Sequence, residues 1–447
     1  MSLALIVLAA GKGTRMRSAD PKVLHKVAGV PMVIHALNAA APLAPARRLV
    51  VVGHGGAAVR AQVQAHDASI EFVEQTEQLG TGHAVDQARA ALADFDGDVA
   101  VLLGDTPFIS PDTLSRIRDR RAEGSDLVVL GFEAADPGKY GRLVAQGDRL
   151  ERIVEAKDAT PEELAIRLCN SGVICADRAL MFDLIAQLND DNASGEYYLT
   201  DIIGLANDAG RTCSVVVCDE AETLGVNSRI DLAAADGIFQ ARARQAAMAA
   251  GVTLQAPDTV YFSYDTQLGQ DVIVEPNVVF GLGVRVEDGV TIRAFSHLEG
   301  CHVAAGATVG PYARLRPGST IGAGARVGNF VETKNADIAA GAKLNHLSYI
   351  GDAEVGAEAN IGAGTITCNY DGVFKHRTEI GAGAFIGSNA SLVAPVSVGA
   401  GAMVGAGSVV TRDVPDQALA VTRAEQKILP DLARKLRERR LAMKAKK

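Results

Sequence analysis

The stretch VAAGATVGPYARLRPGSTIGAGARVG, residues 303–328, decides the fold of the C-terminal half of the chain. Its aliphatic residues fall six apart, at Val303, Val309, Leu315, Ile321 and Val327. A helix does not fit this period, because six residues advance a helix by about 600° and scatter the side chains around its axis. Very short strands separated by tight turns do fit it, with one aliphatic side chain of each strand pointing inward. The stretch therefore predicts a solenoid of stacked triangular coils.

The repeat continues to residue 410, and two slips of its phase are informative. The step from Val327 to Ile338 is one position short of two hexads, and the step from Ile361 to Ile380 is one position more than three hexads. The second slip spans TITCNYDGVFKHRTEI (365–380), whose polar and aromatic side chains could not all face a packed axis. We therefore expect a loop that leaves the coil here, and loops on rigid frames often carry function.

Residues 1–225 have a different pattern, in which short apolar runs alternate with helix-like segments. The runs LALIVLAA (3–10), RLVVVG (48–53) and DVAVLLGD (98–105) are typical of strands, and GHAVDQARAALA (82–93) is typical of a helix. This alternation predicts an α/β domain with a mostly parallel sheet that is covered on both faces.

The two patterns divide the chain into four parts. We expect one domain at 1–227, a linker helix at 228–250, the repeat domain at 251–423 and a basic tail at 424–447. The tail holds nine Lys and Arg against three Asp and Glu, a net charge of +6. This favours a solvated or partner-facing helix over a nucleic-acid-binding segment.

Composition excludes several classes of function. The chain has 447 residues, a net charge of −9, 4% aromatic residues and no Trp, which argues against binding to double- or single-stranded nucleic acid. The apolar run Leu3–Ala10 is too short to cross a bilayer and has no basic segment before it, so we expect neither a membrane span nor a signal peptide. Six cysteines without a CxxC pair favour apolar packing in a reducing cytoplasm.

A glycine-containing loop follows the first predicted strand. It reads LAAGKGTRM (8–16), with Pro21 and Lys22 shortly after it. The loop matches neither a Walker sequence nor a dinucleotide fingerprint. Gly11 and Gly13 let backbone N–H groups approach an anion, and Lys12, Arg15 and Lys22 add positive charge at the same strand end. The pattern suits a triphosphate.

Further motifs follow this loop in a fixed order: QLGTGHA (78–84), GDTP (104–107), YGR (140–142), IVE (153–155), CNSGV (169–173), GEYYLTD (195–201) and GVN (225–227). The series resembles the sugar-1-phosphate nucleotidyltransferases. Together with the hexads, essentially the whole chain resembles the bifunctional N-acetylglucosamine-1-phosphate uridyltransferase/glucosamine-1-phosphate N-acetyltransferase family. The resemblance implies a Rossmann-like nucleotidyltransferase domain, a linker helix, a left-handed parallel β-helix and a bacterial cytoplasmic homotrimer.

For the N-terminal domain the resemblance implies uridylyl transfer from UTP to N-acetylglucosamine-1-phosphate, with release of pyrophosphate. Asp105 and Asn227 would hold Mg²⁺, and Arg15 and Lys22 would stabilise charge at the α-phosphate. Asp105 follows an apolar strand, at the end where open α/β sheets place ligands. The implied contacts to UDP-N-acetylglucosamine are Leu8, Ala9, Ala10, Gly11, Lys22, Gln75, Gly80, Thr81, Leu103, Gly104, Asp105, Gly141, Glu155, Asn170 and Asn227.

For the C-terminal domain the candidate base is His346, in KLNHLSYIG (343–351). An imidazole suits removal of a proton from an amine that attacks a thioester. The resemblance implies acetyl transfer from acetyl-CoA to glucosamine-1-phosphate, with Glu332 orienting His346. The implied contacts to glucosamine-1-phosphate are Arg316, Lys334, Tyr349, Asn360 and Lys375. Those to acetyl-CoA are Ala363, Asn369, Tyr370, Ser388, Ala406 and Arg423.

Three other interpretations compete with this one. The first keeps only the nucleotidyltransferase and makes the β-helix a regulatory or oligomerising scaffold; a base with two nearby lysines argues against it. The second is a zinc enzyme of the γ-carbonic-anhydrase kind, but the spacing of the C-terminal histidines marks no three-His set. The third is a non-enzymatic nucleotide sensor, which the intact GKGTRM loop and Asp105 disfavour.

Overall fold

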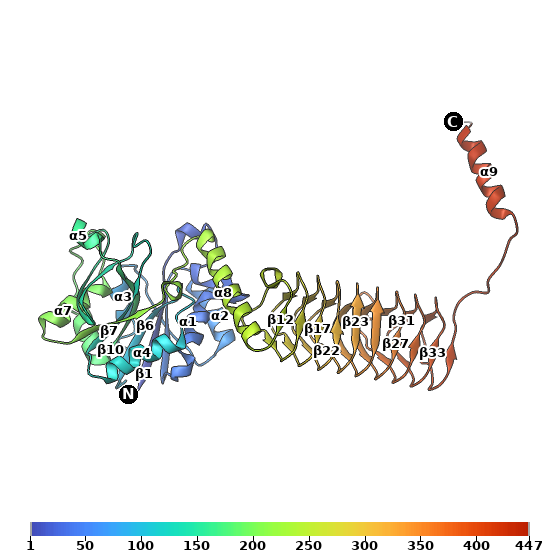
Figure 1. The fold of residues 1–447 in the computed structure, drawn as a ribbon, viewed down its shortest axis with the longest axis horizontal. Coiled ribbons are helices and arrows are strands. Elements are labelled where there is room, and N and C mark those ends of the chain that lie inside the picture. The colour runs from blue at the N-terminus through green and yellow to red at the C-terminus, as the bar shows by residue number, and fades with distance from the viewer. Residues whose placement is uncertain (1, 446–447) are drawn as a thin grey trace. The chain divides into compact units, whose positions relative to one another are not determined.

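The computed structural model describes residues 2–445. The chain separates into two compact units, one ending at Ala243 and the other beginning at Arg244 (Figure 1). Among residues 2–445, no helix has the length and apolar character needed to span a membrane.

A nine-stranded sheet forms the centre of the first unit, in the order β5-β4-β1-β6-β10-β7-β11-β9-β8. Its strands are β1 (Leu3–Ala9), β4 (Arg47–Val52), β5 (Glu71–Glu74), β6 (Asp98–Leu103), β7 (Leu127–Glu133), β8 (Arg142–Gln146), β9 (Arg149–Val154), β10 (Leu168–Asp177) and β11 (Cys213–Cys218). A separate two-stranded ribbon pairs β2 (Lys26–Val27) with β3 (Val30–Pro31).

The expectation of a mostly parallel sheet is wrong in part. Strands β5, β4, β1 and β6 are parallel, but β10 runs antiparallel to both of its neighbours, β6 and β7. A hairpin of β8 and β9 also joins the far edge. The sheet is mixed because these later strands are not all connected by the helical crossovers that parallel pairing needs.

Helices cover both faces of this sheet, as the sequence predicts. Along β1, Ala4 and Ile6 pack into one buried apolar cluster, whereas Leu5 and Val7 pack into another. The helices are α1 (Met32–Ala40), α2 (Gly56–His66), α3 (Thr81–Asp86), α4 (Pro111–Ala122), α5 (Pro161–Leu164), α6 (Arg178–Ile185) and α7 (Ile202–Asp208). Helix α3 is shorter than the helix predicted over 82–93, because turns replace it beyond Asp86.

Helix α8 (Arg229–Ala249) occupies the segment predicted as a linker helix. The boundary between the two compact units falls inside it. The predicted tail helix is also present, as α9 (Leu432–Ala445), and all of its residues are exposed.

The second unit is a parallel β-helix with three faces, as the hexads predict, and its parallel sheets are consistent with the left-handed β-helix that the resemblance implies. The first face stacks β12 (Thr253–Leu254), β14 (Ile273–Val274), β17 (Thr291–Ile292), β20 (Thr308–Val309), β23 (Arg326–Asn329), β25 (Lys343–His346), β27 (Asn360–Ile361), β30 (Phe385–Ile386), β33 (Met403–Val404) and β35 (Leu419–Ala420). The hexad aliphatics Val309, Leu315 and Ile321 are fully buried inside the coils.

The other two faces are joined through the long strands β24 (Glu332–Ile338) and β26 (Tyr349–Val355), whose first halves lie on the second face and whose last halves lie on the third. The second face also holds β15 (Val279–Phe280), β18 (His297–Leu298), β21 (Arg314–Leu315), β28 (Ile366–Cys368), β31 (Ser391–Val393) and β34 (Val409–Val410). The third also holds β13 (Gln267–Leu268), β16 (Arg285–Val286), β19 (Cys301–Val303), β22 (Ser319–Ile321), β29 (Thr378–Ile380) and β32 (Val396–Val398).

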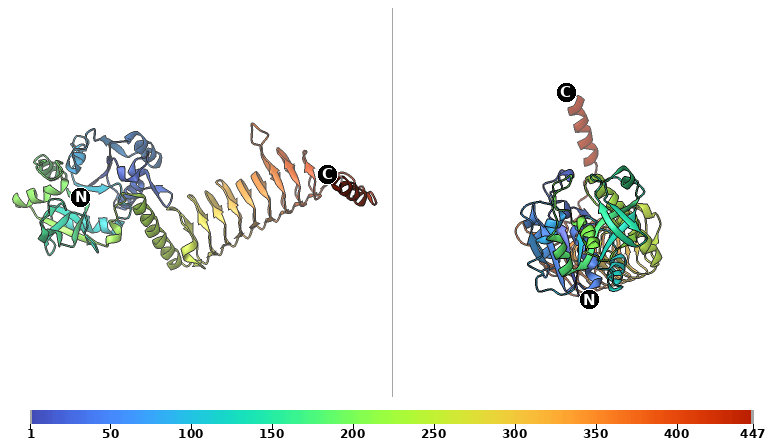
Figure 2. Two further views of the ribbon diagram at one scale, coloured as in Figure 1. Left: turned by 90° about the horizontal axis from the view of Figure 1, so that it is seen from above. Right: turned by 90° about the vertical axis from the view of Figure 1, so that its left-hand side faces the viewer.

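Both phase slips have a structural cause. The coil from Arg326 to its register partner Lys343 is one residue shorter than the preceding coil, which runs from Thr308 to its partner Arg326. At the second slip, Val355 pairs with Ile380, so this coil is longer than both of those. A loop between β28 and β29 accounts for the extra residues and projects from the coil (Figure 2), with Tyr370 bridged to Lys375 near its ends. The predicted loop is confirmed.

Candidate active sites

A cleft with two adjoining cavities opens at the carboxyl ends of β1 and β6 in the first unit. One cavity has a volume of about 330 Å³ and the other of about 280 Å³, and they share Leu8, Thr81, Leu103 and Asp105 as lining residues. The carboxyl edge of parallel strands is where an open α/β sheet leaves room for a ligand. We refer to the first cavity as the loop cavity and to the second as the Glu155 cavity.

Four predicted polar residues meet where the two cavities join. The Lys22 ammonium forms an ion pair with Asp105 and donates to Asn227 Oδ1 at 3.0 Å. Arg15 Nη2 donates to the same Asn227 oxygen at 2.9 Å. The backbone N–H of Asn227 donates to Asp231 Oδ2 at 2.9 Å, which fixes the turn before α8. The structure therefore brings together two cations and two oxygen donors from separate segments of the chain.

This donor set fits Mg²⁺. A carboxylate and an amide oxygen are hard ligands, and Mg²⁺ commonly takes only one or two protein ligands and completes its shell with water and substrate phosphates. Asp105 and Asn227 already share Lys22 as a cationic neighbour, so their oxygens face the same small volume. Among residues 2–445, groups of three or more His, Cys, Asp or Glu with metal-binding geometry are absent.

The loop cavity contains the predicted nucleotide-binding residues Leu8, Ala9, Ala10, Gly11, Lys22, Gln75, Gly80 and Thr81. A Cβ atom on Gly11 would meet no heavy atom within 4 Å, so the missing side chain leaves open space there. The buried Gln75 side chain donates to the Gly80 carbonyl at 3.1 Å. Gly80 has φ +114°, and a Cβ atom on it would lie 2.6 Å from the Tyr197 carbonyl oxygen.

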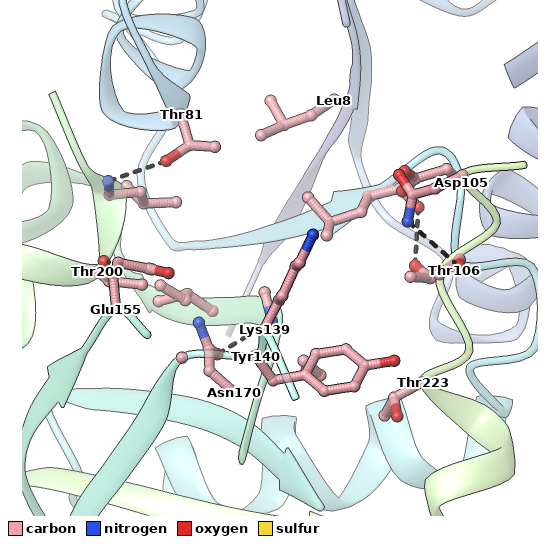
Figure 3. A pocket seen from close by; sticks show the side chains of 18 residues that line it. Leu8, Thr81, Asp105, Thr106, Lys139, Tyr140, Glu155, Asn170, Thr200 and Thr223 are labelled. Carbon is pink, nitrogen blue, oxygen red and sulfur yellow. Dashed lines mark hydrogen bonds between the residues drawn. The ribbon is translucent and has the colours of Figure 1, made fainter. Parts of the chain in front are cut away.

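The Glu155 cavity contains the predicted sugar-binding residues Gly141, Glu155 and Asn170. Thr200 Oγ1 donates to Glu155 Oε1 at 3.2 Å, and the Gly172 N–H donates to Asn170 Oδ1 at 3.0 Å. Burial raises the pKa of Glu155 above its ordinary value. Figure 3 shows Asp105 on one side of this pocket and Glu155, Asn170 and Thr200 on the other.

Some residues differ from the sequence-based expectation. Gly104 lines neither cavity; instead its N–H donates to the Leu8 carbonyl at 2.9 Å and ties β6 to β1. Lys139 and Thr200 line the Glu155 cavity but were not predicted (Figure 3). Lys139 directly precedes the motif YGR, and Thr200 lies inside the motif GEYYLTD, so their places in or beside these motifs were the available signal.

In the second unit, His346 ends β25 and is exposed. Its Nδ1 lies 2.9 Å from Asn329 Oδ1, on the neighbouring strand β23. Glu332, which was expected to orient His346, instead accepts from Arg316 Nη1 at 2.8 Å. The orienting role expected for Glu332 stays a prediction, and within one chain the described residues show no hydrogen bond or ion pair between Glu332 and His346. The reason is register, because Arg316 stacks one coil before β24 on the same face, whereas His346 lies on another face.

Lys334 and Lys375 lie next to each other, although 41 positions separate them in sequence. Contact with Lys375, followed by the charges of Lys375 and Arg316, lowers the pKa of Lys334. Asp352 lies beside this group and accepts from Asn335 at 2.7 Å. Three of the five predicted sugar-phosphate residues therefore gather. Tyr349 is on the second face, and Asn360 begins β27 on the first.

The predicted acetyl-CoA residues fall into two groups. Ala363, Ser388, Ala406 and Arg423 form a column along successive coils, since Asn389 N–H donates to the Ala363 carbonyl, Gly407 N–H donates to the Ser388 carbonyl, and Arg423 Nη1 donates to the Ala406 carbonyl at 2.7 Å. Asn369 and Tyr370 lie in the projecting loop, where Asn369 donates to Asp352.

These two units define a class of protein, a nucleotidyltransferase joined to a hexapeptide-repeat transferase. A MobA-like NTP transferase domain model matches residues 5–195, and a model of the bacterial transferase hexapeptide, with six repeats, matches residues 377–412. A solved UDP-glucose pyrophosphorylase in complex with UDP-glucose is 17% identical, with a TM-score of 0.44, and the likeness covers 54% of this chain and 100% of that one.

Two relatives named bifunctional protein GlmU cover nearly the whole chain. The protein from Ruegeria pomeroyi is 63% identical over 100% of this chain and 99% of its own. The protein from Jannaschia sp. strain CCS1 is 61% identical over 99% and 97%. The chain belongs to the GlmU family. It is a bifunctional enzyme of UDP-N-acetylglucosamine biosynthesis, with uridylyltransferase and acetyltransferase activities, which excludes the single-activity and non-enzymatic interpretations.

Proposed function

We propose that the two activities reside in separate domains, 1–227 and 251–423, joined by the linker 228–250 and followed by the tail 424–447. In the first, Asp105 and Asn227 hold Mg²⁺, and Arg15 and Lys22 stabilise the charge that develops at the α-phosphate of UTP. When bound, the ion supplies positive charge to the phosphate oxygens. The observation that carries this proposal is the meeting of these four side chains where the two cavities join.

The shape of the cleft suggests how the substrates are arranged. UTP lies in the loop cavity against Leu8, Gln75 and Thr81, and N-acetylglucosamine-1-phosphate lies in the Glu155 cavity against Glu155 and Asn170. A phosphate oxygen of the sugar then attacks the α-phosphorus, and the bond to the β-phosphate breaks, so that pyrophosphate leaves. Two anions must approach each other, so positioning and positive charge lower the barrier most.

Removal of divalent metal tests this assignment directly. With a chelator in excess, we expect pyrophosphate release to fall by about 10²-fold or more, because Asp105 and Asn227 no longer hold the charge that UTP needs. Added Mg²⁺ should restore it. Acetyl transfer in the same sample is the control and should not change. Uridylyl transfer that continues in the metal-free sample would contradict the assignment.

In the β-helix we propose that His346 removes the proton from the amine of glucosamine-1-phosphate. The amine nitrogen attacks the thioester carbonyl of acetyl-CoA, its proton passes to the imidazole, and the carbon–sulfur bond breaks to release CoA. Arg316, Lys334 and Lys375 hold the sugar phosphate, since these three cations outnumber the two nearby carboxylates, Glu332 and Asp352, and an excess of positive charge favours an anion. Tyr349 and Asn360 contact the sugar, and the column from Ala363 to Arg423, with Asn369 and Tyr370, holds CoA.

We further propose that the acetyltransferase is a homotrimer. An exposed ladder of aromatic rings runs along the corner between the first and second faces, with Phe295 and Tyr312 stacked at 4.8 Å between ring centroids and Tyr312 and Phe330 at 5.3 Å. Each ring is about half exposed, and Leu347, one coil further and next to His346, is 60% exposed. Second copies of the chain would bury this ladder and bring neighbouring residues to the site.

Replacing Phe330 by Lys tests the trimer. We expect the trimer to dissociate toward monomers, because one lysine from each of the three copies would be buried at the interface. Acetyl transfer should fall by about 10-fold or more. Molecular mass by light scattering and both activities measure this. Uridylyl transfer should persist. The control is Ile230→Lys, at an apolar position on α8 that is 82% exposed. A Phe330 variant that remains trimeric would show that the aromatic ladder does not form the trimer interface.

The cysteines support the proposed cytoplasmic location. All six are free thiols, and Cys175 and Cys213 are buried. Burial raises the pKa of each of these two thiols to about 12, so both stay protonated and unreactive. Unpaired cysteines suit a reducing compartment.

A further inference from the structure

We propose that Asn329 is the residue that positions His346 and fixes its tautomer for acetyl transfer. The inference rests on the proposed role of His346 as the base. It assigns to an amide on the preceding coil the orienting role that the resemblance gave to Glu332. Asn329 would be a positioning residue, because it acts through the imidazole and not on the substrate.

The β-helix register places the two side chains together. Asn329 ends β23 and His346 ends β25, and the two residues are direct partners on the first face. Their backbones are also tied, since the Leu347 N–H donates to the Asn329 carbonyl at 3.0 Å. The side-chain contact, 2.9 Å between His346 Nδ1 and Asn329 Oδ1, is therefore held by a rigid frame.

The chemistry of the amide oxygen decides the tautomer. An amide oxygen only accepts hydrogen bonds, so the contact requires the hydrogen of the neutral imidazole to be on Nδ1. The lone pair is then on Nε2, the nitrogen that remains for an incoming amine. When Nε2 takes the proton, the Nδ1–H still donates to Asn329, so the contact lasts through the reaction. The fixed hydrogen bond also limits rotation of an exposed ring, which keeps Nε2 in one direction.

The neighbouring charged groups do not compete with Asn329 for Nδ1 of His346. Glu332 pairs with Arg316 at 2.8 Å, and Arg314 lies 4.0 Å from its other oxygen. On the first face the charged neighbours are Arg326 on β23 and Lys343 on β25, and Lys343 lies 3.8 Å from Glu358. A neutral amide supports the ring without adding a negative charge beside it.

The test compares Asn329→Ala and Asn329→Asp in the full-length enzyme. We expect Asn329→Ala to lower kcat for acetyl transfer by about 10- to 100-fold, with KM for both substrates changed by less than about threefold. Asn329→Asp keeps an acceptor, so its rate at alkaline pH should recover most of that loss. Its carboxylate favours the protonated imidazole, so the acid limb of the pH–rate profile should move up by about one pH unit.

Three control measurements distinguish the possible outcomes. Asn345→Ala, which changes the same residue type beside His346, should keep the rate and pH profile of the wild type. Uridylyl transfer should be unchanged in every variant and confirms that the chain is folded. His346→Ala tests the proposed base itself.

If His346→Ala retains acetyl transfer, the proposed base is wrong. If His346→Ala is inactive while both Asn329 variants keep the wild-type kcat and pH profile, the positioning role alone is overturned. A change confined to KM would make Asn329 a substrate contact and would also overturn the proposal. If Asn329→Ala assembles poorly, the pH profile of Asn329→Asp decides the question.

Discussion

Replacing Asp105 by Ala is expected to lower pyrophosphate release from UTP by about 10³-fold or more while acetyl transfer continues at the wild-type rate. Asp105 is the only proposed metal ligand that carries a negative charge. Without it, the amide oxygen of Asn227, which is neutral, is the only proposed ligand that remains. The substitution also leaves Lys22 without its ion-pair partner, so the ammonium is free to approach the phosphates but can no longer be held in place by Asp105.

Both half-reactions of the Asp105 variant should be measured with each substrate omitted in turn. Asp190→Ala removes an exposed carboxylate from the same unit and is the matched control, which should keep both activities. Loss of acetyl transfer together with uridylyl transfer would contradict the independence of the two sites. A wild-type rate of pyrophosphate release would remove Asp105 from the proposed metal site.

The repeat domain could be predicted almost completely from sequence, because each coil is decided by contacts within itself and with the coils directly beside it. Buried aliphatics at Val309, Leu315 and Ile321 mark successive strands, and both slips of the hexad phase correspond to real changes in coil length. The side-chain pairing around His346 could not be predicted this way. It depends on which residues of adjacent coils become register partners, and a one-residue slip precedes His346 in sequence.

In the nucleotidyltransferase domain the candidate site residues could be predicted better than the topology of the sheet. Lys22 and Asp105 follow apolar strands and Asn227 was implied by the family resemblance, so the three candidate site residues that meet in the structure were all named from sequence. The direction of β10 was not, because a strand that is covered on both faces forms an apolar run in either direction. Thr200 was missed for a related reason. Its contact with Glu155 joins two segments that are far apart in the chain, and local sequence does not state which threonine reaches a buried carboxylate.

Replacing His346 by Ala is expected to lower acetyl transfer by about 10²- to 10⁴-fold, the range that a positioned general base contributes, and to leave uridylyl transfer unchanged. KM for glucosamine-1-phosphate should change little, because the proposed phosphate contacts Arg316, Lys334 and Lys375 are unchanged in this variant. The residual rate should lose the acid limb of its pH profile, since that limb reports protonation of the base.

A matched control removes a different exposed imidazole from the same β-helix. His297 begins β18 on the second face, and His297→Ala should keep the wild-type rate and pH profile. Wild-type acetyl transfer by the His346 variant would exclude this imidazole as the base. A normal kcat with a raised KM would instead place His346 among the groups that bind the sugar. Only a loss in kcat, with the cationic residues still binding phosphate, matches a base that acts on an amine already held in position by the charges around it.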